Sequence, residues 1–93
     1  MNNFKIIFTE SYVRRARKFF RKHPEILSQY EKCLQLMEIN PFHPSLRLHP
    51  LRGKLTGIYS ISLTLSYRVT IEFLIDDKEI IPLQIGTHDE VYS

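Results

Sequence analysis

The sequence predicts a single α+β domain in which an N-terminal strand is followed by an antiparallel helix hairpin packed on a twisted antiparallel sheet. Apolar residues recur every three or four positions over residues 9–39, and they alternate with polar residues over residues 59–86. The first spacing is typical of amphipathic helices and the second of half-buried strands. A chain of 93 residues holds enough core for one domain, so we expect residues 1–93 to fold as a unit.

The N-terminal strand is expected over residues 4–8, which are short, apolar and β-prone. Thr9 is then placed to cap a helix that continues to Lys22. The residues of this helix expected to face the core are Tyr12, Val13, Ala16, Phe19 and Phe20. Pro24 interrupts the pattern and suits the first turn of a second helix that ends near Ile39, because its missing N–H would be unpaired there.

Residues 40–44 are expected to form a loop, and the rest of the chain to form three antiparallel strands. The strands cover about residues 59–65, 67–75 and 79–86, and a turn at Asp77 joins the last two. The side chains expected to face the core are Tyr59, Ile61, Leu63, Leu65, Tyr67, Val69, Ile71, Phe73, Ile75, Ile81, Leu83 and Ile85.

Composition excludes several classes of protein. The chain is 43% hydrophobic and 25% charged, as expected of a globular domain rather than a disordered or fibrous one. Its single cysteine, Cys33, rules out an intrachain disulfide and a four-thiolate zinc site, and it favours a reducing cytoplasm. The N-terminal residues reach a basic cluster before any long apolar run, so we expect neither a signal peptide nor a membrane-spanning helix. His43 and His49 match no metal-ligand spacing, and we expect no metal or other cofactor.

The net charge of +3 is distributed unevenly along the chain. Residues 1–54 carry eleven Lys or Arg and four Glu, a net charge of +7, whereas residues 55–93 have a net charge of −4. A basic half attracts polyanions, of which nucleic acid is the first candidate and an acidic protein the second. Charge alone does not choose between them, because a cationic run is also typical of the solvated face of a helix.

The strand alternation predicts that an arginine and a histidine share the face opposite the core. The residues expected on this face are Arg68, Thr70, Glu72, Gln84 and His88. Pairing about the turn at Asp77 sets Arg68 opposite Gly86, and His88 then lies close enough to reach the same phosphate. This pair suits cleavage of a phosphodiester by an internal 2′-hydroxyl, since imidazole titrates near neutrality and guanidinium matches phosphate oxygens.

A second imidazole, His49, belongs to the basic segment 47–54, which also contains Arg47, Arg52 and Lys54. We interpret this segment as an anion-binding one. The remaining histidines, His23 and His43, are adjacent to prolines in predicted turns, and we assign both to structural roles.

Three segments resemble motifs of the RelE/ParE superfamily of toxins from type II toxin–antitoxin systems, and in particular its YafQ-like branch. They are Leu-His-Pro-Leu-Arg-Gly at residues 48–53, Ser-Tyr-Arg-Val at residues 66–69 and Ile-Gly-Thr-His-Asp-Glu-Val-Tyr at residues 85–92. The resemblance covers nearly the whole chain and implies a RelE-like fold. It also implies a ribosome-dependent mRNA endoribonuclease that inhibits translation and is held inactive by a cognate antitoxin.

The resemblance further implies roles for four residues. His49 and His88 match histidines of the family, Arg68 matches its phosphate-facing arginine, and Tyr92 matches its terminal aromatic residue. With mRNA in the ribosomal A site, the 2′-hydroxyl is expected to attack the adjacent phosphate, giving a 2′,3′-cyclic phosphate and a 5′-hydroxyl without a metal. We expect His88 to act near the leaving 5′-oxygen, His49 to accept or hold the 2′-hydroxyl proton, and Arg68 to stabilise the phosphorane. Which imidazole is the acid and which the base stays open.

Further contacts with RNA are expected from Arg47, Arg52 and Lys54, which would hold backbone phosphates. Tyr67 is a candidate for stacking on a base or hydrogen-bonding a phosphate, although its core-facing parity also favours packing.

Two positions depart from the YafQ-like pattern. Ser62 and Ser66 stand where that branch has a histidine and an aspartate, and neither serine does acid–base work at neutral pH. Two alternatives therefore stay open: a ParE-like toxin that inhibits DNA gyrase without cutting nucleic acid, and a degenerate, inactive member that still binds an antitoxin. The joint presence of His49 and His88 counts against the ParE-like alternative.

Overall fold

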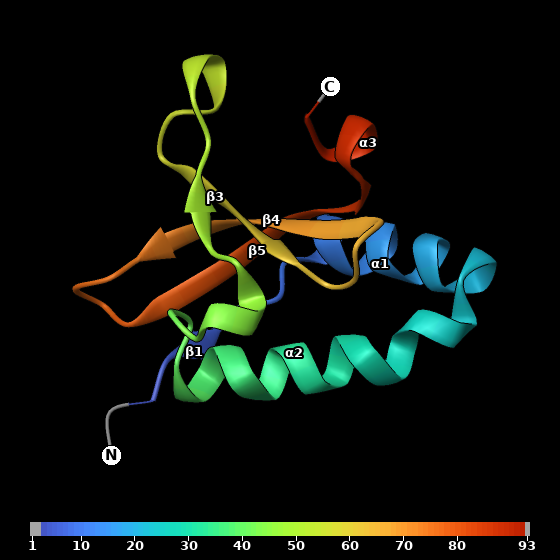
Figure 1. Cartoon of the computed structure of the whole chain (residues 1–93), viewed down its shortest axis with the longest axis horizontal. Helices are drawn as coiled ribbons and strands as arrows, with labels where there is room; N and C mark the ends of the chain where they lie inside the picture. Colours follow the sequence, from blue (N-terminus) through green and yellow to red (C-terminus); the bar gives the residue numbers. More distant parts are fainter. Residues whose placement is uncertain (1–2, 93) are drawn as a thin grey trace.

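Five strands form one mixed sheet at the centre of the computed structural model, which describes residues 3–92 apart from the side chains of Lys54 and Tyr92. The strands are β1 (Lys5–Ile6), β2 (His49–Pro50), β3 (Ile58–Ser62), β4 (Tyr67–Leu74) and β5 (Glu79–Thr87), arranged in the order β1-β5-β4-β3-β2 (Figure 1). Neighbouring strands are antiparallel, except that β1 runs parallel to β5. The predicted α+β class is confirmed, and the purely antiparallel sheet is corrected to a mixed one.

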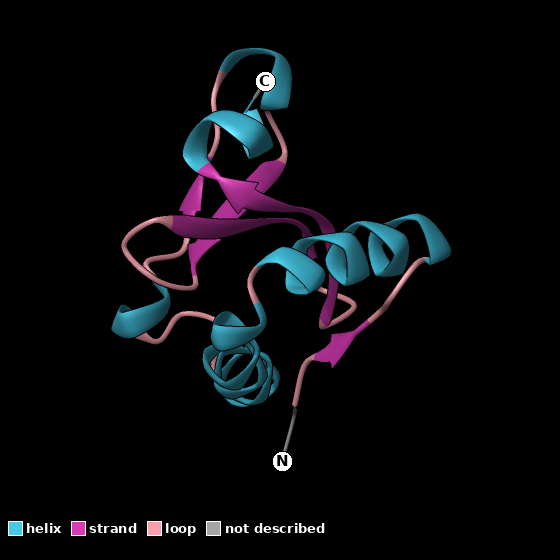
Figure 2. Cartoon of the chain, turned by 90° about the vertical axis from the view of Figure 1, so that its right-hand side faces the viewer, coloured by secondary structure: helices cyan, strands magenta, loops and turns pink. Residues whose placement is uncertain are grey.

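Two helices, α1 (Glu10–Lys22) and α2 (Leu27–Ile39), lie on one side of the sheet (Figures 1 and 2). They are inclined to one another, since Figure 2 shows α2 end-on and α1 from its side. Thr9 caps α1 as predicted, because its side-chain oxygen accepts a hydrogen bond from the backbone N–H of Tyr12 at 3.2 Å. Pro24 begins a short 3₁₀ turn, η1 (Pro24–Ile26), rather than the first turn of α2 itself.

The two helices meet through a buried tyrosine pair. The hydroxyls of Tyr12 in α1 and Tyr30 in α2 lie 2.8 Å apart, and both side chains are buried. Burial is the main cause that raises the pKa of both phenols, so the pair is neutral at physiological pH. Cys33 is buried in the same helix layer as predicted, and its Sγ donates to the carbonyl of Ser62 at 3.9 Å.

The face of the sheet towards the helices forms the core. Its buried residues include Ile61 of β3, Val69, Ile71 and Phe73 of β4, and Ile80 and Ile85 of β5. The predicted inward positions Ile81 and Leu83 are wrong, and Ile80 and Pro82 are buried instead. The pairing passes from Thr70–Gln84 to Ile71–Pro82, so Leu83 is an extra residue that reverses the alternation on its N-terminal side.

The alternation of apolar and polar residues predicts two strands that extend further along the chain than β3 and β4 do. Leu65 was expected to face the core but is 87% exposed, because β3 ends at Ser62 and residues 63–66 form a loop. Ile75 is also exposed, since it lies in the turn before β5. At the N-terminus, only Lys5 and Ile6 of the predicted strand 4–8 pair with β5.

The other side of the sheet carries two small elements that rise from it on opposite flanks (Figures 1 and 2). One is the 3₁₀ turn η3 (Gly53–Leu55), which follows β2, and the other is the short C-terminal helix α3 (His88–Tyr92), which follows β5. Within residues 3–92, no helix has the length and apolar character needed to span a membrane.

Candidate active site

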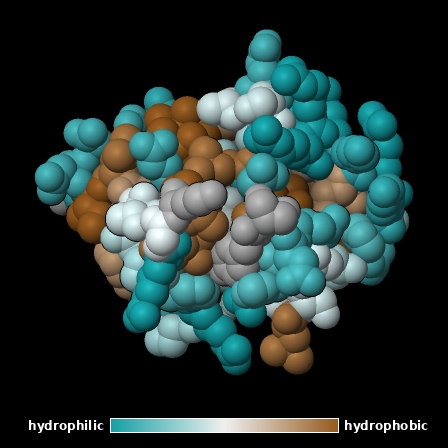
Figure 3. Space-filling model, turned by 90° about the horizontal axis from the view of Figure 1, so that it is seen from above, coloured by the Kyte–Doolittle hydropathy of each residue, from teal (hydrophilic) through white to brown (hydrophobic). Residues whose placement is uncertain are grey.

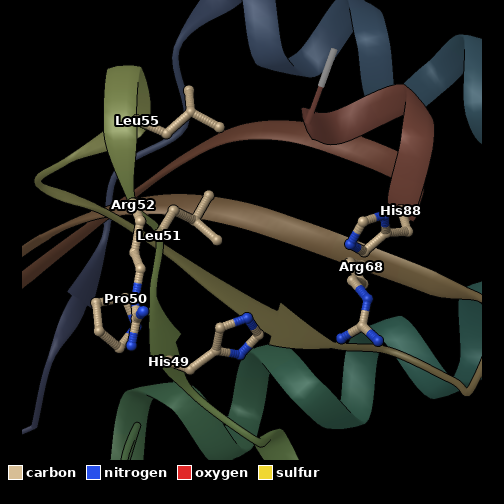
Figure 4. A pocket seen from close by; sticks show the side chains of 7 residues that line it. All are labelled: His49, Pro50, Leu51, Arg52, Leu55, Arg68 and His88. Carbon is tan, nitrogen blue, oxygen red and sulfur yellow. The ribbon is translucent and has the colours of Figure 1, made fainter.

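An open cleft of about 490 Å³ lies on the face of the sheet that the helix hairpin leaves uncovered. It is lined by His49, Pro50, Leu51, Arg52, Leu55, Arg68 and His88. Arg68 and His88 lie on one side of the cleft and Arg52 on the other, with His49 between them (Figure 4). The structure therefore brings together four of the residues singled out in the sequence: His49, Arg52, Arg68 and His88.

The strand register positions Arg68. Arg68 pairs with Gly86 on β5, as predicted, and with Ser62 on β3. The Nη1 atom of its half-buried guanidinium donates to the hydroxyl of Ser62 at 3.0 Å. Because paired residues of antiparallel strands point to the same face, this hydrogen bond holds the guanidinium over the sheet. Ser62 is thus a partner of Arg68, a role that was not predicted from the sequence.

His49 is held by the backbone of its own segment. Its Nδ1 lies 3.1 Å from the carbonyl oxygen of Arg47. A carbonyl only accepts hydrogen bonds, so Nδ1 carries a proton and Nε2 of the neutral ring keeps its lone pair. Arg47 has a left-handed backbone with φ of 51° and precedes β2 by two residues. The exposed imidazole of His49 is thereby fixed in the tautomer that can accept a proton at Nε2.

His88 is positioned by the start of α3. Thr87 and Glu90 form a reciprocal capping pair: the Glu90 carboxylate accepts from the Thr87 N–H at 2.8 Å, and the Thr87 hydroxyl accepts from the Glu90 N–H at 3.3 Å. The Thr87 N–H is the main cause that lowers the pKa of Glu90. His88 is the first residue of this helix, and its Nδ1 lies 3.5 Å from a carboxylate oxygen of Asp89.

Gly86 lets this helix lie close to β5. A Cβ atom at Gly86 would lie 2.8 Å from Oε1 and 3.1 Å from Cβ of Glu90. A side chain at this position would push against the capping pair, and hence against the residue that follows it, His88. Because Gly86 pairs with Arg68, as predicted, α3 begins close to the arginine.

The cleft is electropositive. None of its seven lining residues is acidic, whereas two are arginines and two are histidines. Leu51 and Leu55 form an apolar wall on the η3 side. Among the described residues, no three His, Cys, Asp or Glu side chains are grouped so that they could hold a metal ion. The arrangement is suited to an anion that receives a proton from one imidazole and gives one to another.

Other predicted site residues lie elsewhere or are not described. The side chain of Arg47 lines a neighbouring pocket rather than this cleft. Tyr67 is on the core side of the sheet, where its hydroxyl lies 3.3 Å from Nδ1 of His23, so it does not reach the cleft and the stacking contact is not formed from this position. The side chains of Lys54 and Tyr92 are outside the described part of the structure.

Two features of the cleft are not apparent from the sequence: the apolar wall formed by Leu51 and Leu55, and the contact between Ser62 and Arg68. Thr70 has the predicted parity with Arg68, but it is only 3% exposed. The pairing of Ser62 with Arg68 requires a hairpin centred on residue 65. This hairpin was not predicted, because Leu65 fits the alternation of apolar and polar residues that is typical of a strand.

Comparison with known proteins supports the fold. No family model and no curated protein sequence matches the chain. Among solved structures, the chain is similar to YafQ from E. coli, with a TM-score of 0.78, 14% identity and coverage of 97% of this chain and 99% of YafQ. The YoeB/ParE toxin from Agrobacterium tumefaciens has a TM-score of 0.72 and 17% identity, over 91% of this chain and 99% of that toxin. A chain of the E. coli DinJ–YafQ toxin–antitoxin complex has a TM-score of 0.76 and 17% identity, over 98% of this chain and 99% of that chain. The chain therefore shares the fold of these toxins, and the RelE-like α+β fold expected from the sequence is confirmed.

Proposed function

We propose that the protein is the toxin of a toxin–antitoxin pair and acts as a ribosome-dependent endoribonuclease on mRNA in the A site. The observation that carries this proposal is the single cleft that joins His49, Arg68 and His88 and contains no acidic lining residue. The requirement for the ribosome rests on the resemblance to the YafQ-like branch. The basic N-terminal half, with a net charge of +7 over residues 1–54, is consistent with a large RNA partner.

His49 is the general base in this proposal. Its Nδ1 proton is engaged by the carbonyl of Arg47, which leaves Nε2 to take the proton of the attacking 2′-hydroxyl. The 2′-oxygen then forms a bond to the adjacent phosphorus, and the bond from phosphorus to the 5′-oxygen breaks. The products are a 2′,3′-cyclic phosphate and a 5′-hydroxyl.

His88 and Arg68 complete the reaction. His88 gives its proton to the leaving 5′-oxygen. Its Nδ1 lies 3.5 Å from a carboxylate oxygen of the neighbouring Asp89. Arg68 holds the phosphate oxygens while negative charge increases on the phosphorane. Arg52, on the opposite side of the cleft, is placed to bind an adjacent backbone phosphate.

The proposed antitoxin has a matching surface on the helix hairpin. A groove of about 620 Å³ runs between α1 and α2, with a mainly apolar lining that includes Phe8 and Leu27, both more than 40% exposed. Arg17 and Arg21 also line it. This combination suits an amphipathic antitoxin helix whose apolar face enters the groove and whose acidic residues meet the arginines.

The proposal is tested by inducing the protein in bacteria and mapping cuts in a reporter mRNA by primer extension. Removing one acid–base group typically lowers a rate by about 10²–10⁴, so His88→Ala and His49→Ala are expected to relieve growth arrest and remove the cuts. His43→Asn is the matched control, because His43 lies outside the cleft and Asn keeps the acceptor that receives the Ser45 N–H. Unchanged arrest and cleavage in His88→Ala would overturn the mechanism, and DNA damage with intact mRNA would identify gyrase inhibition instead.

A further inference from the structure

A second pocket adjoins the candidate active site and shares a wall with it. It has a volume of about 360 Å³ and is lined by Ser45, Arg47, Ser62, Leu63, Thr64, Leu65 and Arg68. Arg68 also lines the first cleft, so this residue is shared by the two spaces. An extended ligand that touches Arg68 in the first cleft can therefore continue into the second pocket.

The second pocket is chemically suited to a phosphate with an attached sugar. Its seven lining residues include two arginines and three hydroxyl side chains, and none is acidic. Guanidinium groups bind phosphate oxygens in a bidentate manner, and serine or threonine hydroxyls donate to or accept from sugar hydroxyls. One of these hydroxyls, on Ser62, already accepts a hydrogen bond from Arg68 at 3.0 Å.

Arg47 links this pocket to the proposed base. Its side chain is exposed and lines the second pocket, whereas its carbonyl oxygen accepts the Nδ1 proton of His49. Arg47 has a left-handed backbone conformation, with φ of 51°. A non-glycine residue rarely keeps this conformation unless the surrounding structure requires it, and such residues are concentrated at functional sites.

Leu65 gives the pocket an apolar rim. Its side chain is 87% exposed in the loop between β3 and β4. The loop is held in shape by Thr64, whose hydroxyl accepts from the backbone N–H groups of Ser66 and Tyr67 at 3.1 and 3.2 Å. An apolar side chain held at the edge of a polar, cationic pocket is suited to contact with the flat face of a base.

We propose that this pocket is a second nucleotide subsite, which binds the nucleotide on the 5′ side of the scissile phosphate together with that nucleotide's own 5′-phosphate. The assignment of the pocket to the 5′ side, rather than the 3′ side, of the scissile phosphate rests on the proposed function. The attacking 2′-hydroxyl belongs to the 5′ nucleotide and must lie near His49, the imidazole that Arg47 ties to the pocket. His88, which serves the leaving 3′ nucleotide, lines only the first cleft.

The test compares two dinucleotides that differ only in a terminal 5′-phosphate, each with 2′-deoxyribose at its first position so that cleavage is blocked. Binding to the purified full-length chain is followed by two-dimensional ¹H–¹⁵N NMR. We expect the 5′-phosphate to tighten binding roughly tenfold, as for a hydrogen-bonded charge pair, and to shift the amides of Arg47, Thr64 and Leu65.

The informative variant is Arg47→Asn. Asparagine tolerates the left-handed conformation and keeps the backbone carbonyl that orients His49, so only the guanidinium is lost. We expect this variant to lose the tenfold gain from the 5′-phosphate. Arg14→Gln, an exposed arginine of α1 that lines neither pocket, is the control and is expected to keep the gain. Arg47→Gly repeats the test with a second residue that accepts positive φ.

Three results would overturn the subsite: no response of the unmodified chain to the phosphorylated dinucleotide at millimolar concentration, no advantage of the 5′-phosphate, or a full advantage in Arg47→Asn. The proposed reaction is tested separately from the subsite, by measuring whether His88→Ala still cleaves mRNA. If His88→Ala cleaves normally while the phosphate effect depends on Arg47, the subsite stands and the assignment of the acid is wrong.

Discussion

The hydroxyl of Ser62 lies 3.0 Å from Nη1 of Arg68 and orients the guanidinium of this residue, which is shared by the two pockets. We classify Ser62 as a positioning residue. A hydrogen bond to a charged group is worth about 1.5–3 kcal/mol, so Ser62→Ala is expected to lower the rate of mRNA cleavage about tenfold or more. Ser62→Thr keeps the hydroxyl and is expected to restore most of the rate. Equal rates for Ser62→Ala and Ser62→Thr in a ribosome-based cleavage assay would contradict this role.

Ser62→His combined with Ser66→Asp tests whether the chain has lost chemistry, since these are the residue types of the YafQ-like branch at the two positions. Higher toxicity in the double variant would favour the degenerate alternative. Because the hydroxyl of Ser62 already has a partner in Arg68, we expect the double variant to be less active than the unmodified protein.

The buried tyrosine pair is a second residue-scale feature, and it concerns stability rather than activity. Tyr12→Phe leaves the Tyr30 hydroxyl buried without the partner it has at 2.8 Å. An unsatisfied buried hydroxyl costs about 1–3 kcal/mol, so the variant is expected to lower the free energy of unfolding by this amount. The double variant with Tyr30→Phe removes both hydroxyls and is expected to be less destabilised than Tyr12→Phe. Urea denaturation measures both, and a more unstable double variant would contradict the explanation.

At the scale of elements, the capping pair of α3 makes the placement of His88 dependent on pH. The pKa of Glu90 is lowered from its ordinary value of 4.5 by the hydrogen bonds from Thr87. A carboxylate with a lowered folded-state pKa contributes stability that is fully present above 4.5 and is lost as pH falls through the lowered value. We therefore expect the backbone amide signal of Thr87 to titrate below pH 4.5, together with signals of α3.

Glu90→Gln is the control for this titration. Glutamine supplies the same acceptor to a capping pair but does not ionise. The variant is expected to keep the α3 signals at neutral pH and to lose their acid titration. A titration that persists in Glu90→Gln would place its cause in another carboxyl group.

The β5 strand illustrates how one irregularity changes the side chains of a whole element. The extra residue Leu83 turns Ile80 and Pro82 towards the core, while its own carbonyl accepts a hydrogen bond from Arg15 of α1 at 3.1 Å. The residues C-terminal to the bulge keep the expected alternation, so the pairing of Arg68 with Gly86 is unaffected. The bulge thus lies where it alters the core without moving the candidate active site.

At the scale of the whole molecule, two cationic surfaces lie on different sides of the sheet. One is the cleft with Arg52 and Arg68, and the other is the outer face of α1. Hydrophilic side chains gather on the right-hand side of Figure 3, over the part of the molecule where α1 lies. The α1 cations Arg14, Arg15, Arg17, Lys18, Arg21 and Lys22 are all exposed. The two surfaces are therefore expected to contact different parts of a large partner.

Binding to ribosomes is expected to depend steeply on salt if both surfaces contact phosphates. Neutralising about six phosphates costs on the order of 10³ in affinity between about 50 and 200 mM salt. Arg14→Glu with Lys18→Glu is expected to weaken ribosome binding at least tenfold and to flatten this salt dependence, while leaving dinucleotide binding in the cleft unchanged. Sedimentation with ribosomes measures the effect.

The control for charge reversal is Lys5→Glu with Lys32→Glu, which makes the same change in net charge at exposed lysines of β1 and α2. If both double variants weaken ribosome binding equally, net charge alone is responsible and the α1 face has no specific role.

The sequence by itself determined the features that depend on neighbours along the chain. These include the Thr9 cap, the two amphipathic helices and the register that sets Arg68 opposite Gly86, because periodicity, capping and a short turn are local. It also identified His49, Arg68 and His88 as the candidate site residues.

Only the tertiary structure decided the features that depend on contacts between distant segments. Among them are the parallel pairing of β1, the bulge at Leu83 and the packing of Tyr67 against His23. The contact of His49 with the Arg47 carbonyl is local, but it involves a left-handed backbone at Arg47 that residue type does not indicate. Each of these is stabilised by a neighbour in space rather than in sequence or by a strained local conformation, so residue type and spacing did not reveal it. The sequence thus identified candidate residues of the cleft, whereas the tertiary structure determined which of them face one another and the tautomer of His49.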